Sequence, residues 1–197
     1  MNKIQTFIFV GRSGSGKGTQ INLLKEYIAK KDPKVKAYIF VMGDIFRSLM
    51  KKEGYIQNFI NEKISQGLLV PDLIANNLFI YDLVTNFSPK QHLYIDGIPR
   101  SIPQAEAVID IFKFYNRLNP IILDIKVSKK EVEKRMLMRG RSDDNKDAIM
   151  ARHSFYEKKV VPAIEFLKEK SGFTYIEIDG EKTTKEVHFN IIKSLNI

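Results

Sequence analysis

Residues 4–20 read Ile-Gln-Thr-Phe-Ile-Phe-Val-Gly-Arg-Ser-Gly-Ser-Gly-Lys-Gly-Thr-Gln, and this stretch decides the fold. The apolar run from Ile4 to Val10 is dense in β-branched and aromatic side chains, which predicts a buried strand. Glycines then crowd residues 11–18, and apolar side chains recur at helical spacing from Ile21 to Ile28. A strand, a glycine-rich loop with a lysine and a helix are typical of a site that binds phosphate.

The loop itself has the spacing of a P-loop: Gly11, four residues, Gly16 and Lys17. Its glycines let backbone N–H groups turn toward an anion, and the start of the helix adds unpaired N–H groups. The usual pattern places Ser or Thr directly after the lysine, but Gly18 stands there, so Thr19 is the nearest hydroxyl. The alternative is a glycine turn that only joins a strand to a helix. The glycines and the lysine together favour a nucleotide site.

Composition narrows the class of protein. A chain of 197 residues that is 44% hydrophobic is long enough for one globular domain with a real core. The lack of cysteine excludes disulfides and cysteine-ligated zinc, and it favours an intracellular setting. We expect no signal peptide, because the chain enters the first strand with Lys3 as its only early charge, and no membrane span, because no apolar run approaches ~20 residues.

A net charge of +9 raises the question of nucleic-acid binding. The lysines, however, are spread along the chain in pairs such as Lys30-Lys31 and Lys158-Lys159, which are typical of solvated helix surfaces. We find no RNA-binding signature and no glycine-arginine repeat. We therefore expect no nucleic-acid partner and assign part of the charge to binding nucleotide phosphates.

Strands and helices alternate along the rest of the chain. Further strands are predicted at 36–41, 92–96, 120–127 and 173–179. Helices are predicted from Ile45, over 55–66 and 72–85, over 103–118, after Ser128, over 145–171 and after Thr183, with a turn at 42–44. Ser128 with Glu131 and Thr183 with Glu186 have capping-box spacing. The alternation predicts an α/β domain with a parallel sheet between helix layers, and the short helices between 44 and 67 are interpreted as an insertion.

Arginines gather where the predicted strands end. Because ligands bind beyond the carboxyl ends of the strands in open α/β sheets, six of the eight arginines are candidate phosphate ligands: Arg47, Arg100, Arg135, Arg139, Arg141 and Arg152. The alternative is a solvated basic face with Asp143 and Asp144 as counter-charges. Asp96 ends an apolar strand and can hold Mg²⁺ through water, unless it is only a turn or cap carboxylate.

The chemistry that these residues suit is phosphoryl transfer to a phosphate. No nucleophile–base set appears, and the three histidines stand alone in the sequence. An acceptor phosphate needs no base, because its second pKa of about 6 leaves it largely ionised at neutral pH. The task is to neutralise two polyanions, which calls for magnesium, a lysine and several arginines.

With these motifs, the chain resembles the adenylate kinase family of nucleoside monophosphate kinases over nearly its full length. Residues 11–20 resemble the family's phosphate loop, although Arg12-Ser13 replaces its usual small residue and proline. Gly43-Asp44-x-x-Arg47 and residues 67–72 resemble the two ends of the monophosphate-binding insert. Further similarities are Asp96-Gly97-Ile98-Pro99-Arg100, the lid-flanking arginines with Asp143-Asp144, and Asp179-Gly180.

The resemblance implies direct in-line transfer from MgATP to AMP, giving two ADP. It implies ATP binding by Gly11, Ser13, Gly14, Ser15, Gly16, Lys17, Gly18, Thr19, Arg135 and Lys182. It implies AMP binding by Met42, Arg47, Val70, Gly97, Arg100, Gln104, Arg141 and Arg152. It implies catalytic roles for Lys17, Arg100, Arg139, Arg141 and Arg152, and water-mediated Mg²⁺ binding by Asp96 and Thr19.

The resemblance also implies one P-loop kinase domain over 1–197, an insert at 42–71 and a very short lid at 139–144 that has no place for zinc. Met42 stands where the family usually has a threonine near the adenine, so UMP, CMP or another acceptor stays open. Gln104 favours AMP, but with Ser101 it has capping-box spacing too. A nucleic-acid-associated ATPase is the alternative of another class. We expect a cytoplasmic monomer.

Overall fold

The sheet runs through the centre of the molecule. The computed structural model describes residues 4–141, 143–170 and 172–197. Within them the sheet has five strands, all parallel, in the order β2-β3-β1-β4-β5. The strands are β1 (Thr6–Val10), β2 (Ala37–Val41), β3 (His92–Asp96), β4 (Ile121–Lys126) and β5 (Thr174–Asp179). The predicted parallel α/β sheet is confirmed, and each predicted strand begins or ends within two residues of the observed one.

Strand β1 lies in the middle because its side chains are apolar on both faces. Phe7 and Phe9 pack on one face, and Ile8 and Val10 pack on the other. All four side chains are buried. A strand that is buried on both sides reads as a continuous apolar run, and this is the pattern that the sequence shows.

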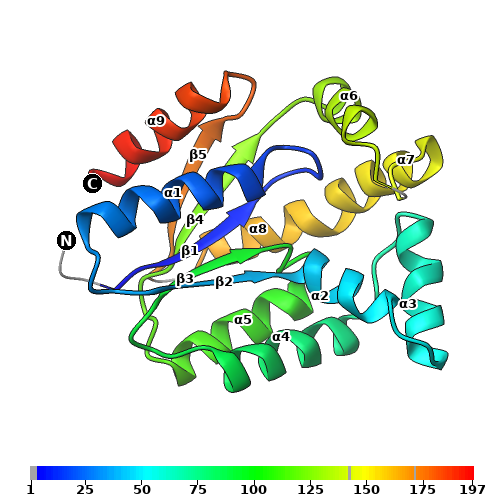
Figure 1. Cartoon of the computed structure of the whole chain (residues 1–197), viewed down its shortest axis with the longest axis horizontal. Coiled ribbons are helices and arrows are strands. Elements are labelled where there is room, and N and C mark those ends of the chain that lie inside the picture. The colour runs from blue at the N-terminus through cyan, green and yellow to red at the C-terminus, as the bar shows by residue number, and fades with distance from the viewer. Residues whose placement is uncertain (1–3, 142, 171) are drawn as a thin grey trace.

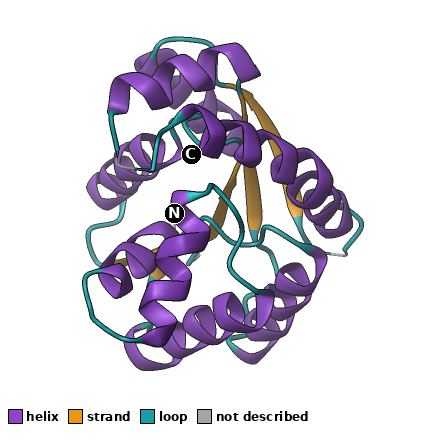
Figure 2. Ribbon diagram, turned by 90° about the vertical axis from the view of Figure 1, so that its right-hand side faces the viewer, coloured by secondary structure: helices purple, strands orange, loops and turns teal. Residues whose placement is uncertain are grey.

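Helices cover both faces of the sheet (Figure 1). One layer holds α1 (Lys17–Lys31) and α9 (Thr184–Leu195), and α6 (Lys129–Arg139) packs into the same core. The other layer holds α4 (Asp72–Asn86), α5 (Ile102–Phe114) and α8 (Val161–Lys168). Figure 2 shows the strands enclosed between these helices. The insert region contributes α2 (Met42–Met50) and α3 (Tyr55–Ser65).

Three helix boundaries differ from the sequence prediction. Residues 42–44, predicted as a turn, form the first turn of α2, since apolar Met42 and Phe46 are both buried there. Helix α5 ends at Phe114 rather than at Leu118, and Asn116 follows with a left-handed φ of 54°. The helix predicted over 145–171 consists of α7 (Lys146–Phe155), a π-helical turn at Tyr156–Val160 and α8; residue 171 lies outside the described residues.

Of the capping boxes predicted at Ser128 and Thr183, only the one at Thr183 is complete. Thr183 and Glu186 form the reciprocal pair at the start of α9. At the start of α6, Ser128 Oγ accepts from the N–H of Glu131, but the carboxylate of Glu131 binds Arg135 instead. The N–H of Ser128 donates to Glu181 from the neighbouring loop. The complete box at Ser128 was therefore wrong, because Glu131 pairs with Arg135 in the same helix and the N–H of Ser128 finds its partner in the loop that contains Glu181.

The strand order places the site. Strands β1 and β3 are neighbours, and the chain leaves them toward opposite edges of the sheet, β1 to β2 and β3 to β4. Ligands bind in such a crevice beyond the carboxyl ends of the strands. The register pairs Phe9 with Asp96, so the glycine loop after β1 and the carboxylate that ends β3 lie side by side.

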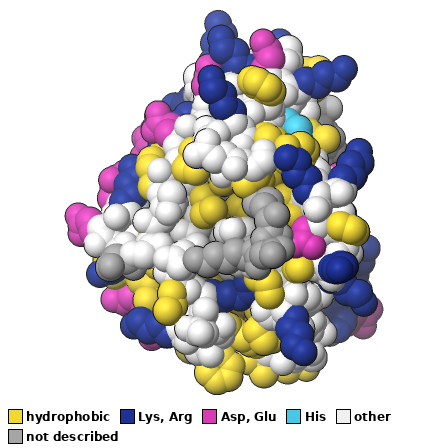
Figure 3. Space-filling model, turned by 90° about the vertical axis from the view of Figure 1, so that its left-hand side faces the viewer, with side chains coloured by type: hydrophobic (Ala, Val, Ile, Leu, Met, Phe, Trp, Pro, Cys, Tyr) yellow, Lys and Arg dark blue, Asp and Glu magenta, His cyan; other side chains and the backbone are white. Residues whose placement is uncertain are grey.

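The helices and the surface bear on two expectations from the sequence, that the chain has no membrane span and no nucleic-acid partner. No helix among the described residues is long and apolar enough to cross a membrane. On the face drawn in Figure 3, Lys and Arg side chains are dispersed around the rim with acidic and apolar ones between them. They do not form one continuous basic band on this face.

Candidate active site

A cleft of about 1150 Å³ opens at the carboxyl ends of the strands. Its wall joins the glycine loop, the insert and the lid-flanking residues. Among the predicted site residues, it is lined by Ser13, Gly14, Gly16, Lys17, Gly18, Thr19, Met42, Arg47, Val70, Asp96, Gly97, Arg100, Gln104, Arg135, Arg139, Arg141 and Arg152. Gly11 and Ser15 are part of the loop but not of this lining, and neither is Lys182, whose Nζ lies 4.0 Å from Asp179.

The glycine loop presents the start of α1 to the cleft. Gly16 is the N-cap residue, has a φ of 93° that suits glycine, and gives the helix no side-chain cap. The first N–H groups of a helix have no partner within it, and the helix dipole makes this end positive. Gly16, Lys17, Gly18 and Thr19 line the cleft, so this uncapped helix end faces the space where phosphates would lie.

Lys17 folds back over the loop. Its Nζ donates to the carbonyls of Gly11 (3.1 Å) and Arg12 (2.9 Å) and lies 4.0 Å from Asp96 Oδ1. Burial lowers the pKa of Lys17, and the positive charges of Arg100 and Arg139 lower it further, while Asp96 raises it. Lys17 is thus a partly desolvated cation that an anion in the cleft would stabilise.

Arg100 lines the cleft as well, and it too is affected by the charge of Asp96. Burial lowers the pKa of its guanidinium; the charges of Arg152 and Arg47 act in the same direction, and Asp96 opposes them. Its Cζ lies 5.7 Å from the ring centroid of Phe155. A Cβ on Gly97 (φ 87°) would come within 3.4 Å of Arg100 Nη2 and 3.1 Å of Met42 Cβ, so glycine leaves room for both side chains.

The insert supplies one further arginine and two apolar wall residues. Arg47 forms an ion pair with Asp44 one turn earlier in α2, and its side chain is 40% exposed. Met42 and Val70 are buried in the core beneath the cleft. Arg47 can therefore turn to a ligand at low cost, because an exposed ion pair contributes only about 0–1 kcal/mol.

Gln104 has both ends of its amide bound in this structure. Its Oε1 accepts from the N–H of Arg100 at 2.8 Å, and its Nε2 donates to Asp72 Oδ1 at 2.8 Å. Ser101 Oγ also donates to Asp72, and it accepts from the N–H of Gln104 as the N-cap of α5. The capping box is thus half formed, and the amide is oriented while it lines the cleft.

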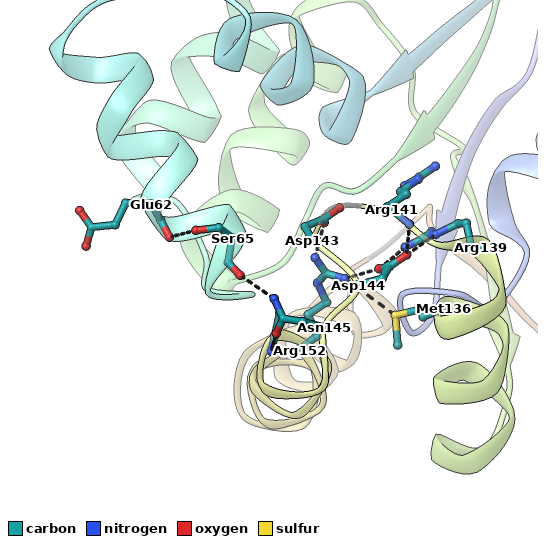
Figure 4. A network of polar contacts seen from close by, with 10 residues as sticks. Glu62, Ser65, Met136, Arg139, Arg141, Asp143, Asp144, Asn145 and Arg152 are labelled. Carbon is teal, nitrogen blue, oxygen red and sulfur yellow. Dashed lines mark hydrogen bonds and ion pairs between the residues drawn. The ribbon is translucent and has the colours of Figure 1, made fainter.

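A network of arginines and aspartates forms the lid side (Figure 4). Asp144 has a fully buried side chain and accepts from Arg139 Nη2 (2.7 Å), Arg139 Nε (2.9 Å) and Arg152 Nη1 (2.9 Å). Asp143 also pairs with Arg152. Burial raises the pKa of Asp144, but the hydrogen bonds from Arg139 and Arg152 outweigh it and leave the pKa below its ordinary value. Ser142, which belongs to the predicted lid, lies outside the described residues.

Arg135 and Arg141 complete the basic lining. Arg135 donates to Glu131 (2.7 Å) and to the carbonyl of Gly180 (3.2 Å), which joins α6 to the loop before α9. Burial lowers the pKa of Arg141, with Arg139 and Arg47 adding to the effect and Asp143 and Asp144 opposing it. All six predicted phosphate ligands among the arginines therefore face one cleft.

Sequence reasoning missed two residues that shape the site. Phe155 lines the cleft and supports Arg100, and Asp72 orients Gln104. The signal for Phe155 is its spacing of three residues from Arg152, which places both on one helix face. Asp72 gave no such signal, because an acid in the first turn of a helix usually serves the helix alone.

Comparison with known proteins agrees with this geometry. The family described as adenylate kinase matches residues 9–172. An adenylate kinase of Azobacteroides pseudotrichonymphae genomovar. CFP2 is 32% identical over 94% of each chain. Adenylate kinases of Leptospira biflexa (30% identical, 98% of this chain and 100% of the relative) and Parabacteroides distasonis (29%, 96% of each) are similar over nearly the full length. The P-loop, the arginine-lined cleft and this family match agree with one another. The chain therefore belongs to the adenylate kinase family and is a phosphotransferase.

Proposed function

We propose that the protein transfers the γ-phosphoryl group of MgATP to AMP. The observation that carries the proposal is the cleft itself, in which cationic side chains from different elements face one space. Lys17 and the start of α1 would form the donor set, and Arg100 with Arg47 would form the acceptor set. Lys17 and Arg100 both line this cleft, so both cations face the space in which the two phosphates would meet.

The cationic residues of the cleft would have different roles according to where they lie. Lys17 and the loop N–H groups would hold the donor phosphates, and Arg47 and Arg100 would fix the acceptor phosphate in line with them. Arg139, Arg141 and Arg152 would neutralise charge on the moving group. Closure of the insert (42–71) and of the lid (139–144) would exclude water, which otherwise accepts the phosphoryl group.

The cleft fits a magnesium ion that comes with the nucleotide. Asp96, whose side chain is 17% exposed, and Thr19 both line the cleft beside the loop, and oxygen atoms are the ligands that Mg²⁺ prefers. Asp96 and Thr19 would hold the ion through water. Magnesium bound to the phosphates would neutralise part of their developing charge.

AMP as the acceptor is supported by Gln104, whose amide lines the cleft in a fixed orientation and can pair with the base edge. Met42 in place of threonine supports the alternative of UMP, CMP or another monophosphate. A cytoplasmic monomer remains part of the proposal. A nucleic-acid-associated ATPase has only the +9 charge in its favour.

The decisive test is a coupled assay with MgATP and, one at a time, AMP, GMP, UMP, CMP, dTMP or no acceptor. Fast turnover with AMP alone supports the proposal. Fast turnover with UMP or CMP keeps the mechanism and changes the acceptor. Hydrolysis at the same rate in every reaction would contradict monophosphate kinase activity, and stimulation by RNA would then be measured.

A further inference from the structure

Arg12 occupies the position in the phosphate loop at which the adenylate kinase family usually has a small residue. Its side chain does not line the cleft but turns away from it and is 15% exposed. Its Cζ lies 4.5 Å from the centroid of the Tyr156 ring, and its Nη2 donates to Glu157 Oε1 at 3.0 Å. A cation stacked on an aromatic ring and paired with a carboxylate is held at two points.

The backbone of the same residue holds the catalytic lysine. The carbonyl of Arg12 accepts from Lys17 Nζ at 2.9 Å and from the N–H of Ser15 at 3.1 Å. A movement of Arg12 therefore moves the oxygen that positions the ammonium of Lys17. The side-chain contacts to Tyr156 and Glu157 therefore tether the residue whose carbonyl positions Lys17, and they restrict the movement of the loop backbone at that point.

The segment that contacts Arg12, residues 152–157, also contacts Arg100 and the aspartates of the lid side. Tyr156 and Glu157 open the π-helical turn, a feature that is frequent at functional sites. One turn earlier, Arg152 pairs with Asp143 and Asp144 of the lid side. Phe155, between them, contacts the guanidinium of Arg100. Residues 152–157 thus touch the phosphate loop, the acceptor arginine and the lid network.

We propose that Arg12 is a positioning residue that fixes the phosphate loop, and with it Lys17, relative to Arg100 and Arg152. The proposal rests on the proposed function, because the geometry matters most for in-line transfer between two phosphates. Near-attack geometry is sensitive to small shifts: a misplacement of about 1 Å can cost about 100-fold in rate. A purely structural role would affect only the stability of the fold.

The matched control is Lys129, which binds the same carboxylate without touching the loop. Lys129 Nζ lies 2.7 Å from Glu157 Oε1. Lys129→Ala removes one ion pair from Glu157 and leaves the Arg12 contacts in place. We expect its turnover to stay at the wild-type level, so a difference between the two variants isolates the contact to the loop.

Steady-state kinetics with MgATP and AMP, well below the melting temperature, test the role. Arg12→Ala is expected to lower kcat about tenfold while both KM values change by about twofold or less, because ground-state binding is largely kept. Adding Glu157→Gln should lower kcat no further, since both variants remove one interaction. Arg12→Lys should recover part of the loss. A lower melting temperature with unchanged kcat would overturn the proposal.

Hydrogen exchange without nucleotide separates this proposal from the proposed function. Arg12→Ala should speed amide exchange in residues 11–19, and Lys129→Ala should not. Unchanged exchange in Arg12→Ala overturns the proposal, whatever the kinetics show. If the wild type has no acceptor-dependent turnover, the proposed function fails, and the exchange result alone decides whether Arg12 holds the loop. Should Arg12→Ala not fold, Arg12→Lys and Glu157→Gln, which keep side-chain size, serve the same comparison.

Discussion

The two sides of the cleft treat their arginines differently. On the lid side, Arg139 and Arg152 are neutralised by Asp144, which has no exposed side-chain surface, and Arg152 also pairs with Asp143. On the proposed acceptor side, Arg100 has an aromatic ring as its neighbour, and burial lowers its pKa. The first pair of cations is already compensated, and the second site carries charge that an incoming phosphate would compensate.

The difference suggests that the arginines of the lid side are held in place by the fold, whereas Arg100 is left to bind a ligand. Buried ion pairs contribute little net stability but cost about 3–5 kcal/mol when one partner is removed, so Asp144 holds two arginines in place without a ligand. Among the described residues, Arg100 forms no ion pair with a carboxylate, so binding of an anion would be its main compensation. Lid-side changes should therefore affect folding first, and acceptor-side changes should affect turnover first.

Arg100→Ala should have the largest effect. We expect kcat to fall by roughly 10³-fold, in the range known for arginines that stabilise phosphoryl transfer, with the melting temperature nearly unchanged. Steady-state kinetics measure kcat, thermal unfolding measures the melting temperature, and calorimetric titration measures the affinity for MgATP. Arg100→Lys, which keeps the charge and loses the fork, should lie in between. An equal loss of MgATP affinity would show that Arg100 does not belong to the acceptor side.

Asp144→Asn should act mainly on stability. Loss of the carboxylate leaves two arginines uncompensated and should lower the free energy of unfolding by about 3 kcal/mol, measured by urea unfolding. Asp143→Asn is the matched control, since the side chain of Asp143 is 20% exposed and, among the described residues, forms an ion pair with Arg152 alone. This variant should lose less unfolding free energy. Equal losses in the two variants would contradict the central place of Asp144.

The lowered pKa of Asp144 predicts that part of the folding stability is lost in acid. Because the folded-state pKa of Asp144 lies below the ordinary value of 3.8, its contribution is fully present above that pH and is lost as the pH falls through the folded pKa. The difference in unfolding free energy between wild type and Asp144→Asn should therefore shrink below about pH 3.8. A difference that stays constant with pH would mean that the carboxylate is not the cause.

Arg47→Ala should raise the KM for the acceptor about tenfold, the effect of losing one charge-assisted hydrogen bond of roughly 1.5 kcal/mol. The exposed pair with Asp44 adds little stability, so unfolding should be unaffected. Asp44→Asn frees Arg47 and should leave that KM equal or lower. A higher KM in Asp44→Asn would place the acceptor contact on Asp44 rather than on Arg47.

Met42→Thr should have the smallest effect. Met42 is buried at the cleft wall beside Gly97, and the exchange should favour AMP over UMP and CMP by about fivefold in kcat/KM, less than a change in direct contact with the substrate gives. Competition assays between AMP and UMP measure the ratio. Val70→Ala, another buried residue of the same wall, controls for a general loosening of the pocket. An unchanged ratio would place Met42 outside the base pocket.

Much of the fold follows from the sequence because its signals are local. The apolar run at Ile4–Val10, the glycine loop and the strand that ends at Asp96 predict the parallel sheet, which is confirmed. They also predict the edge of the sheet at which the cleft is found. Helix ends were less predictable. The capping of α6 depends on Glu181 from a distant loop, and the first turn of α2 depends on burial of Met42 and Phe46.

The chemical types of the site were likewise fixed by the sequence, while their partners were not. A lysine after glycines, an acid at a strand end and six arginines at strand edges indicate phosphate chemistry wherever the chain folds. That Asp144 compensates Arg139 and Arg152, that Asp72 orients Gln104, and that Arg12 packs on Tyr156 were decided only by the tertiary structure. These partners are 5 to 144 residues apart in the chain, and the packing around the sheet of the glycine loop and of the helical segments that carry them brings them within bonding distance.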